Sequence, residues 1–481
     1  MMLIYIVFII YTVLLLLVFL YSLAQFDLYL KYKKNKETTL TTKPIKSWPK
    51  VTIQLPVFNE NYVVERLIHN IVKLDYPREQ IEFQVLDDST DDSILKTARI
   101  IQDYQEEGID IKHIWRKKRI AFKAGALKEG LKTASGDYLA IFDADFMPSP
   151  EWLKKVLPHF HTNKVGVVQT RWGHLNRHHS LLTEIQAFAL DFHFTLEQVG
   201  RNTAQHFINF NGTAGIWRKE CIIDAGNWHG DTLTEDLDLS YRAQLKDWKF
   251  IYLEDVVTPA ELPIAMSAAR SQQFRWNKGA AENFRKNFKK VVGNNTLSFR
   301  SKCHSFFHLL NSSMFLIILS LALISIPVLY IKASHPELRV LFYILSVLGI
   351  STILFILVYW TSYRKINTGG KVNFFKFIRL FLLFFSVAMG LSLHNSIAVL
   401  EGHLGKKSAF IRTPKFNDVL TNNTYLKKDF TVVHFFELCL AIYFAFAIYS
   451  AFHLNEYGLL FFHLMLFFGF SFVSYKNIFS K

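Results

Sequence analysis

Two pairs of aspartates follow apolar runs in this 481-residue chain. Asp87 and Asp88 stand in the stretch "LDDSTDD", and Asp143 and Asp145 stand in "DADFMPSP". One such pair would have an ordinary explanation, because acidic residues are common in loops. Two pairs at the carboxyl ends of parallel strands would converge on one edge of a sheet, where α/β folds bind their ligands.

The second pair predicts a metal site. Alternation along a strand would point the carboxylates of Asp143 and Asp145 the same way. Hard oxygen ligands suit Mg²⁺ or Mn²⁺, and Mg²⁺ usually takes one or two carboxylates together with substrate phosphates. The expected ligand is therefore a nucleotide diphosphate bound with Mg²⁺ or Mn²⁺.

Two further runs place charged residues on predicted helices. "TLTEDLDL" (232–239) puts Glu235 and Asp236 in a first helical turn, where the helix dipole alone would favour acids. "QQFRWNKGAAENFRKNFKK" (272–290) combines aromatic residues with cations. Its apolar stripe at helical spacing consists of Phe274, Ala281, Phe284, Phe288 and Val291. The cations off this stripe, including Lys286, are predicted to face lipid phosphates from an interfacial helix.

The elements that must position these residues alternate between Trp48 and Ala265. Strands are predicted at 51–55, 81–87, 109–114, 138–144 and 165–170. Helices are predicted at 60–73, 91–107, 120–133 and 150–158. This order indicates an α/β domain with a mainly parallel sheet and helices on both of its faces. No G-x-G-x-x-G follows the first strand and no P-loop motif occurs, which argues against a dinucleotide dehydrogenase and a P-loop ATPase.

The regions that flank this domain are apolar. Residues 1–24 carry no charged side chain and predict an uncleaved transmembrane anchor, because the cationic start and the cleavage site of a signal peptide are missing. Further spans are predicted at 306–331, 340–361, 432–453 and 457–475. The stretch 377–400 could span the bilayer, lie in its interface or re-enter, and the cationic loop that follows favours an interfacial helix.

The formal net charge of +15 arises largely from cations beside these spans. Seven lysines lie between Lys31 and Lys50, directly after the first span. Cationic flanks mark the cytoplasmic side, so the segment 25–304 is predicted to be cytoplasmic, in a bacterial inner membrane or an equivalent membrane. A protein that binds nucleic acid would need a basic face on its soluble domain, and this charge distribution argues against that function.

Seven motifs occur in the order seen in processive family-2 glycosyltransferases of the cellulose synthase superfamily. They are "QLPVFNE" (54–60), "VLDDSTDD" (85–92), "FKAGALKEG" (122–130), "FDADF" (142–146), "NGTAGIWR" (211–218), "TEDLDL" (234–239) and "QQFRW" (272–276). The chain most closely resembles the plant cellulose-synthase-like A proteins, which are mannan and glucomannan synthases, over residues 50–292. The resemblance implies an α/β fold: a GT-A (Rossmann-like) glycosyltransferase domain inserted between α-helical transmembrane segments.

The predicted domain division has five parts. They are an N-terminal transmembrane anchor (1–24), a basic cytoplasmic linker (25–47), a GT-A catalytic domain (48–265), amphipathic interfacial helices with Q-x-x-R-W (266–304) and a C-terminal membrane domain (305–481). Within the last part, "FIRTPK" resembles the F-x-x-T-x-K gating loop of cellulose synthases. That loop is predicted over 405–416, with Phe410, Thr413 and Lys415 as its motif residues.

The resemblance also implies roles on the donor side. Asp87 or Asp88 would hold the base and ribose of the sugar nucleotide, and Lys123 would lie near its diphosphate. Asp143 and Asp145 would position the sugar nucleotide and its metal.

On the acceptor side, Asp236, next to Glu235, is similar to the general base that takes the proton from the acceptor hydroxyl. In the Q-x-x-R-W motif, Gln272 and Arg275 would meet the diphosphate and Trp276 would stack on the acceptor sugar. Further acceptor contacts are expected from the "NGT" run, which is Asn211, Gly212 and Thr213.

These expectations describe a membrane-embedded inverting glycosyltransferase. It would move a hexose from GDP-mannose or UDP-glucose to a growing β-linked polysaccharide, with coupled export as a further expectation. "KAGALKEG" favours GDP-mannose, because glucan-type relatives usually carry an asparagine after "KAG". Two alternatives stay open: a lipid glycosyltransferase that adds one sugar to ceramide or diacylglycerol, and a non-catalytic subunit that binds sugar nucleotides.

Overall fold

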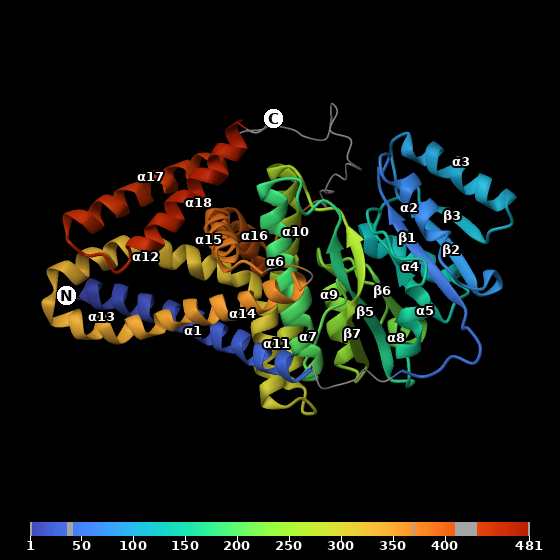
Figure 1. Ribbon diagram of the computed structural model, residues 1–481, viewed down its shortest axis with the longest axis horizontal. Coiled ribbons are helices and arrows are strands. Elements are labelled where there is room, and N and C mark those ends of the chain that lie inside the picture. Colours follow the sequence, from blue (N-terminus) through green and yellow to red (C-terminus); the bar gives the residue numbers. More distant parts are fainter. Residues whose placement is uncertain (1, 36–41, 369, 371, 409–430, 480–481) are drawn as a thin grey trace.

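The computed structural model describes residues 2–35, 42–368, 370, 372–408 and 431–479. A sheet-containing domain lies on one side of the molecule and a bundle of long helices on the other (Figure 1). Helix α10 (Met266–Gly293) runs between the two parts. The catalytic domain and the apolar helices therefore share one long connecting element.

The sheet has seven strands in the order β3-β2-β1-β4-β6-β5-β7. Their bounds are Val51–Val57 (β1), Ile81–Asp87 (β2), Ile111–Trp115 (β3), Tyr138–Ile141 (β4), Val165–His174 (β5), Gly215–Arg218 (β6) and Lys249–Ala260 (β7). Strands β1 to β4 pair in parallel, whereas β6 runs antiparallel to both β4 and β5. The predicted α/β fold with a mainly parallel sheet is confirmed, and β6 and β7 extend it beyond the predicted strands.

Strand β4 ends at Ile141, three residues before the predicted end. Asp143 and Asp145 therefore lie in the loop after the strand. The prediction that strand alternation points their carboxylates the same way is wrong, because no strand geometry applies there.

Two layers of helices cover the sheet. On one face lie α2 (Val64–Ile71), α3 (Ser93–Glu106) and α5 (Trp152–Val156), and their core is built from the catalytic domain alone. On the other face lie α4 (Phe122–Thr133), α6 (Leu181–Phe192), α7 (Gln198–Thr203), α8 (Lys219–Asp224) and α9 (Glu235–Gln244). The core of this second face continues into the apolar helices.

The apolar helices reach that second core from three places in the sequence. Helix α1 (Met2–Asn35) contributes Leu28, Tyr29 and Tyr32. Helices α14 (Ile350–Ile366) and α15 (Phe374–Gly390) contribute aromatic residues that include Tyr359 and Phe377. Helix α1 thus extends beyond residue 24 into the segment predicted as a linker, and its last turns are buried against the catalytic domain.

The described residues contain four helical segments that are long and apolar enough to cross a membrane. They are 2–34, 299–334, 336–366 and 432–453. The second comprises α11 (Phe299–Leu310) and α12 (Met314–Ser334), the third includes α13 (Arg339–Ser346) and α14, and the fourth is α17 (Val432–His453). The predicted span 457–475 forms α18 (Leu460–Phe479), which is not among the four, so its spanning stays a prediction.

The stretch 377–400 is not one helix. It is divided between α15 and α16 (Ser392–Leu404), which meet at a bend of 54°. The prediction of a single interfacial helix is therefore wrong in its geometry, since the pair has the shape of a broken span or a re-entrant segment.

The stripe on α10 packs on protein. Phe284 and Phe288 stack on each other and contact Phe306 of α11, and Val291 is fully buried. Off the stripe, Lys286 pairs with two aspartates of the catalytic domain, at 2.7 and 3.0 Å. The prediction that Lys286 faces lipid phosphates is wrong, because local spacing does not show which partner covers a helix.

Candidate active site

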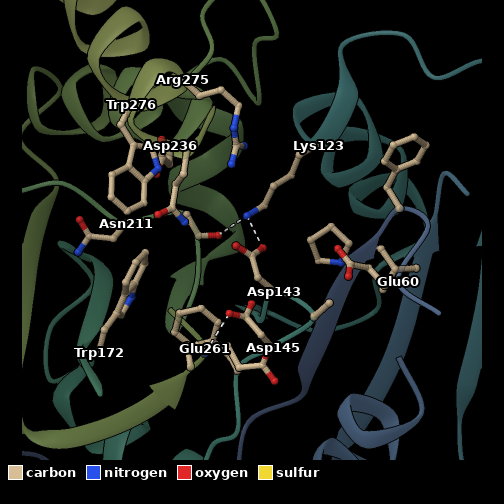
Figure 2. A pocket seen from close by; sticks show the side chains of 18 of the residues that line it. Glu60, Lys123, Asp143, Asp145, Trp172, Asn211, Asp236, Glu261, Arg275 and Trp276 are labelled. Carbon is tan, nitrogen blue, oxygen red and sulfur yellow. Dashed lines mark hydrogen bonds and ion pairs between the residues drawn. The ribbon is translucent and has the colours of Figure 1, made fainter. Parts of the chain in front are cut away.

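A pocket opens at the carboxyl edge of the sheet, between the strand ends and α10 (Figure 2). The predicted site residues that line it are Asp88, Lys123, Asp143, Asp145, Asn211, Gly212, Glu235, Asp236, Gln272, Arg275 and Trp276. Asp87 and Thr213 lie behind its wall. Phe410, Thr413 and Lys415, the gating-loop residues, lie outside the described residues. Motifs separated by nearly two hundred residues thus meet in one cavity.

Lys123 ties two walls of the pocket together. Its Nζ donates to Asp143 Oδ1 at 2.5 Å and to the Gly212 carbonyl at 2.8 Å, as Figure 2 shows. Burial acts to lower the pKa of Lys123, but the neighbouring carboxylates, Asp143 first, raise it overall. The ammonium group therefore stays charged in the pocket, which provides a fixed cation for an anionic ligand.

Gly212 lets the "NGT" loop approach the acids of α9. Its φ of +78° lies in the left-handed region, and a Cβ there would stand 3.0 Å from Asp236 Oδ2 and 3.4 Å from Lys123 Nζ. Any side chain would push against both groups and would also strain the backbone. Glycine is required here for the loop to lie against Asp236.

Asp236 lies in the first turn of α9, where its Oδ1 accepts a hydrogen bond from the Leu237 N–H at 2.8 Å. Burial and then the charge of Glu235 raise the pKa of Asp236 to about 7, against the opposing effect of Lys123. Burial likewise raises the pKa of Glu235. A carboxyl with a pKa near neutrality is suited to accept a proton from a substrate hydroxyl.

The two acids of the D-x-D run have different surroundings. The side chain of Asp143 is 34% exposed and faces the pocket. Asp145 is 1% exposed, and its Oδ2 accepts a hydrogen bond from the Glu261 N–H at 3.2 Å. The donor of this hydrogen bond is the residue that directly follows β7.

These donors fit a divalent cation that is completed by its substrate. The oxygens of Asp143 and Asp145 are hard ligands, and such a site needs only one or two carboxylates when phosphates and water supply the rest. Among the described residues, the groups of three ligating side chains within 4.8 Å of one another lie elsewhere, at Asp27, His206 and His304 and at His229, Asp231 and Asp238. The D-x-D therefore offers a partial site rather than a closed cage.

The structure separates the two aspartates after β2. Asp87 is fully buried and accepts hydrogen bonds from His113 Nε2 at 2.9 Å and from the Ser89 N–H at 2.8 Å. Although burial acts to raise it, these bonds hold the pKa of Asp87 below its usual value. Asp88 lines the pocket and binds Arg116 through both oxygens, at 2.7 and 2.5 Å. Asp88, rather than Asp87, is placed to meet a ligand.

Gln272, Arg275 and Trp276 lie two to three turns into α10, which begins at Met266 and not at the motif itself. Burial lowers the pKa of the Arg275 guanidinium, and Glu235, Asp143 and Asp236 oppose that shift. The same three acids thus act on both Lys123 and Arg275.

Several lining residues were not predicted. Glu60, Arg119, Trp172, His174 and Glu261 also face the cavity. Glu60 ends the "QLPVFNE" motif and could have been proposed from its position after β1. The guanidinium of Arg119 lies 3.4 Å from the centre of the Phe58 ring, a contact that no local sequence pattern predicts.

Residues 49–279 match a family model described as "Glycosyltransferase like family 2". Glucomannan 4-beta-mannosyltransferase 1 of Oryza sativa subsp. japonica is 35% identical over 398 residues, which cover 80% of this chain and 73% of that protein. Glucomannan 4-beta-mannosyltransferase 9 of Arabidopsis thaliana is 36% identical over 355 residues, 68% of this chain and 67% of that protein.

A solved structure shows the same fold. The mannosyltransferase PcManGT from Pyrobaculum calidifontis, in complex with GDP-Man and Mn²⁺, superposes with a TM-score of 0.53 at 17% identity. The match covers 82% of this chain and all of that one. The chain therefore belongs to the cellulose-synthase-like A family within the family-2 glycosyltransferases, and it is a membrane hexosyltransferase with a GT-A catalytic domain.

Proposed function

We propose that this enzyme transfers mannosyl residues from GDP-mannose to the end of a growing β-1,4-linked mannan or glucomannan. The observation that carries the proposal is the placement of Asp236, a carboxyl with a pKa near 7, in one pocket with Lys123 and Arg275. The choice of mannose rests on the relatives, which are named glucomannan mannosyltransferases, and on the structural neighbour, which holds GDP-Man.

The leaving group of this reaction is a nucleoside diphosphate, on which negative charge develops. Lys123 and Arg275 provide two fixed cations where that charge forms, and preorganised charges of this kind stabilise a transition state by several kcal/mol. Asp143 and Asp145 would hold Mg²⁺ or Mn²⁺, which supplies Lewis-acid stabilisation of the diphosphate when bound. Asp88 and Gln272 lie at the pocket wall for further donor contacts.

The acceptor hydroxyl is a poor nucleophile at neutral pH. Asp236 would take its proton, and a positioned general base contributes about 10²–10⁴-fold to the rate. Attack from the side of a single base, opposite the leaving diphosphate, inverts the anomeric carbon, so that an α-linked donor gives a β-glycoside. Glu235 supports the base by raising its pKa.

The acceptor sugar would stack on Trp276, with Asn211, Gly212 and Thr213 behind it. An indole face binds the apolar face of a sugar ring, and Trp276 lines the pocket on the same side as Asn211 (Figure 2). Trp276→Ala should therefore slow chain elongation more than hydrolysis of the donor. Equal loss of both activities would contradict the stacking role.

The catalytic domain would face the cytoplasm, because the lysines after the first helix mark that side. The division into a catalytic domain (48–265), a connecting region (266–304) and a membrane domain (305–481) is part of the proposal, whereas the boundary predicted at residue 24 between anchor and linker falls inside α1. Its catalytic part agrees with the extent of the family match. Export of the product by the same membrane helices extends the proposal.

The decisive experiment uses the purified protein in lipid nanodiscs with GDP-mannose or UDP-glucose and Mg²⁺ or Mn²⁺. We expect a polymer from GDP-mannose that a β-mannanase digests. If only a β-1,4-glucanase digests the product, the donor is UDP-glucose instead of GDP-mannose. If the product is a lipid carrying one sugar, the acceptor is a lipid instead of a polysaccharide. A non-catalytic subunit is set aside, because the chain belongs to a family of transferases and its expected acids share one pocket.

A further inference from the structure

A short π-helical turn, His193–Glu197, interrupts the path from α6 to α7. Such turns are rare and are found frequently at functional sites. His193 and Glu197, four residues apart, lie side by side in this turn and pair at 2.8 Å. Neither residue has a part in the proposed chemistry, although both are tied to the pocket.

Glu197 is a carboxylate with 3% exposure, and three donors hold it. It accepts hydrogen bonds from His193 Nδ1 at 2.8 Å, from Gln25 Nε2 at 2.7 Å and from Arg201 Nη2 at 3.1 Å. Burial acts to raise the pKa of Glu197, but Arg201 and then His193 keep it well below its usual range. A buried charge is tolerated only with partners of this kind, so the turn has one well-defined arrangement.

The other nitrogen of His193 points to the pocket wall. His193 Nε2 lies 3.4 Å from Asn211 Oδ1, and this oxygen accepts from Asn209 Nδ2 at 2.5 Å and from Gln198 Nε2 at 3.4 Å. These contacts fix the orientation of the Asn211 amide. Its Nδ2 is buried and has no hydrogen-bond partner among the described residues, although Asn211 lines the pocket. A buried donor without a partner is costly, which points to a ligand that completes it.

The same turn supports an aromatic wall of the pocket. Phe194 packs against Trp172, with ring centroids 4.7 Å apart and planes inclined by 30°. Trp172 also contacts Phe146 edge-on. Figure 2 shows Trp172 and Trp276 on the same side of the cavity, with Asn211 between them. Residues of this one turn therefore contact both Asn211 and Trp172, which are neighbours on that side of the cavity.

We propose that the turn His193–Glu197 is the positioning element of the acceptor subsite. Glu197 and His193 orient Asn211, so that its Nδ2 donates to a hydroxyl of the terminal hexose of the acceptor. Phe194 holds Trp172 as a second aromatic surface on the same side of the cavity as Trp276. This inference rests on the proposed function only in taking a hexose polymer as the acceptor.

The test uses Glu197→Gln in full-length protein in nanodiscs. Glutamine keeps the shape of the side chain but removes the charge that holds His193. We expect the KM for mannohexaose to rise about tenfold while kcat changes less, because hydrogen bonds to charged groups are among the strong ones. The dissociation constant for GDP should keep its wild-type value, since Glu197 is not among the residues that line the pocket.

A matched control is Glu82→Gln. Glu82 is also fully buried and hydrogen bonded, to Thr52, Ser135 and Lys112, but it lies away from the pocket. It should leave the affinities for mannohexaose and for GDP unchanged. A second pair, His193→Gln and His193→Ala, distinguishes positioning from packing, because only glutamine keeps a hydrogen-bonding group near Asn211.

Binding of mannohexaose and cellohexaose is measured directly by calorimetry, so the result does not depend on transfer from GDP-mannose. Weaker oligosaccharide binding by Glu197→Gln supports the inference even if another sugar nucleotide proves to be the donor. Wild-type binding in Glu197→Gln, or an equal loss of GDP binding, overturns it. If Glu197→Gln does not fold, unchanged oligosaccharide binding in both His193 variants overturns it, and loss in His193→Ala alone supports it.

Discussion

The pocket has two walls that are anchored by different parts of the chain. At the wall after β2, Asp87 is held by His113 and Asp88 by Arg116, all within the catalytic domain. At the wall formed by α10, which carries Gln272, Arg275 and Trp276, the polar contacts of the helix reach the apolar helices. The first wall can therefore form within the catalytic domain alone, whereas the second wall, with its proposed donor and acceptor contacts, depends on how the membrane helices are assembled.

This dependence rests on three contacts that join α10 to α16 and α17. Arg270 Nη1 donates to both oxygens of Glu437 on α17, at 2.8 and 2.9 Å. Gln273 accepts from an asparagine of α16 at 2.9 Å, and the fully buried Lys278 pairs with a glutamate of α16, also at 2.9 Å. These residues alternate along the helix with Gln272, Arg275 and Trp276 of the motif. The helix that presents the motif is therefore placed by its partners in the membrane part.

The largest effect is expected from Asp236→Asn, which should impair reaction with the acceptor without impairing nucleotide binding. Asparagine keeps the size of the side chain but cannot take a proton from the acceptor. Transfer should fall by about 10²–10⁴-fold, while the dissociation constant for GDP changes little. Radiolabelled sugar incorporation and nucleotide calorimetry measure the two sides. Substantial remaining transfer would rule out Asp236 as the base.

The next largest effect is expected on stability, when an ion pair that holds α10 is broken. Arg270→Met leaves Glu437 buried without its cation, which costs about 3–5 kcal/mol of stability. Lys112→Met in the catalytic domain should cost less, since Lys112 is 44% exposed and Glu82 keeps its other hydrogen bonds. Thermal unfolding in nanodiscs compares the two. Equal losses of thermal stability in Arg270→Met and Lys112→Met would contradict the expected difference between these two ion pairs.

Lys123→Met should affect the donor side first. Lys123 bonds both Asp143 and the Gly212 carbonyl, and its loss removes a cation from the expected diphosphate site. Hydrogen bonds to charged groups are worth about 1.5–3 kcal/mol, so the KM for the donor should rise roughly tenfold to hundredfold. The affinity for mannohexaose in the absence of donor serves as the control. A larger loss there than for the donor would place Lys123 on the acceptor side.

A smaller effect is expected from pH. Because the pKa of Asp236 is raised to about 7, transfer should fall about tenfold for each pH unit below 7 and level off above it. The folded state binds this proton more tightly than the unfolded chain, so its contribution to stability declines as the pH rises from 3.8 towards 7. Asp236→Asn should remove that slope from the stability profile. Asp87, whose pKa is lowered, should not titrate in this range.

Local patterns were sufficient for the parallel half of the domain. Continuous apolar runs mark buried parallel strands, and the four predicted helices of the catalytic domain occur where the periodicity places them. Strand β6 was missed because it has four residues, too few to show a period, and its place between β4 and β5 depends on long-range pairing. The break between α15 and α16 was also missed, because the apolar run 380–393 continues across it and shows no change of periodicity.

The motifs located most of the pocket, but they did not give its internal geometry. Asp143 and Asp145 were paired by strand alternation, whereas both follow β4 in a loop that leaves Asp143 half-buried at the pocket and Asp145 almost fully buried in its wall. Trp172 and the turn His193–Glu197 belong to no short motif. Their positions follow from packing between elements far apart in the sequence, which a single sequence does not record.

The contacts of α1 determine when the enzyme can finish folding. Gln25 meets its carboxylate 172 positions later in the chain, and Asp27 bonds His304 another hundred residues on. The first helix leaves the ribosome long before these partners exist, and contacts of such high sequence separation form late. The acceptor wall should therefore mature only after α11 and the later helices that hold α10 have been synthesised, so nascent chains stalled before α11 should not elongate a glycan.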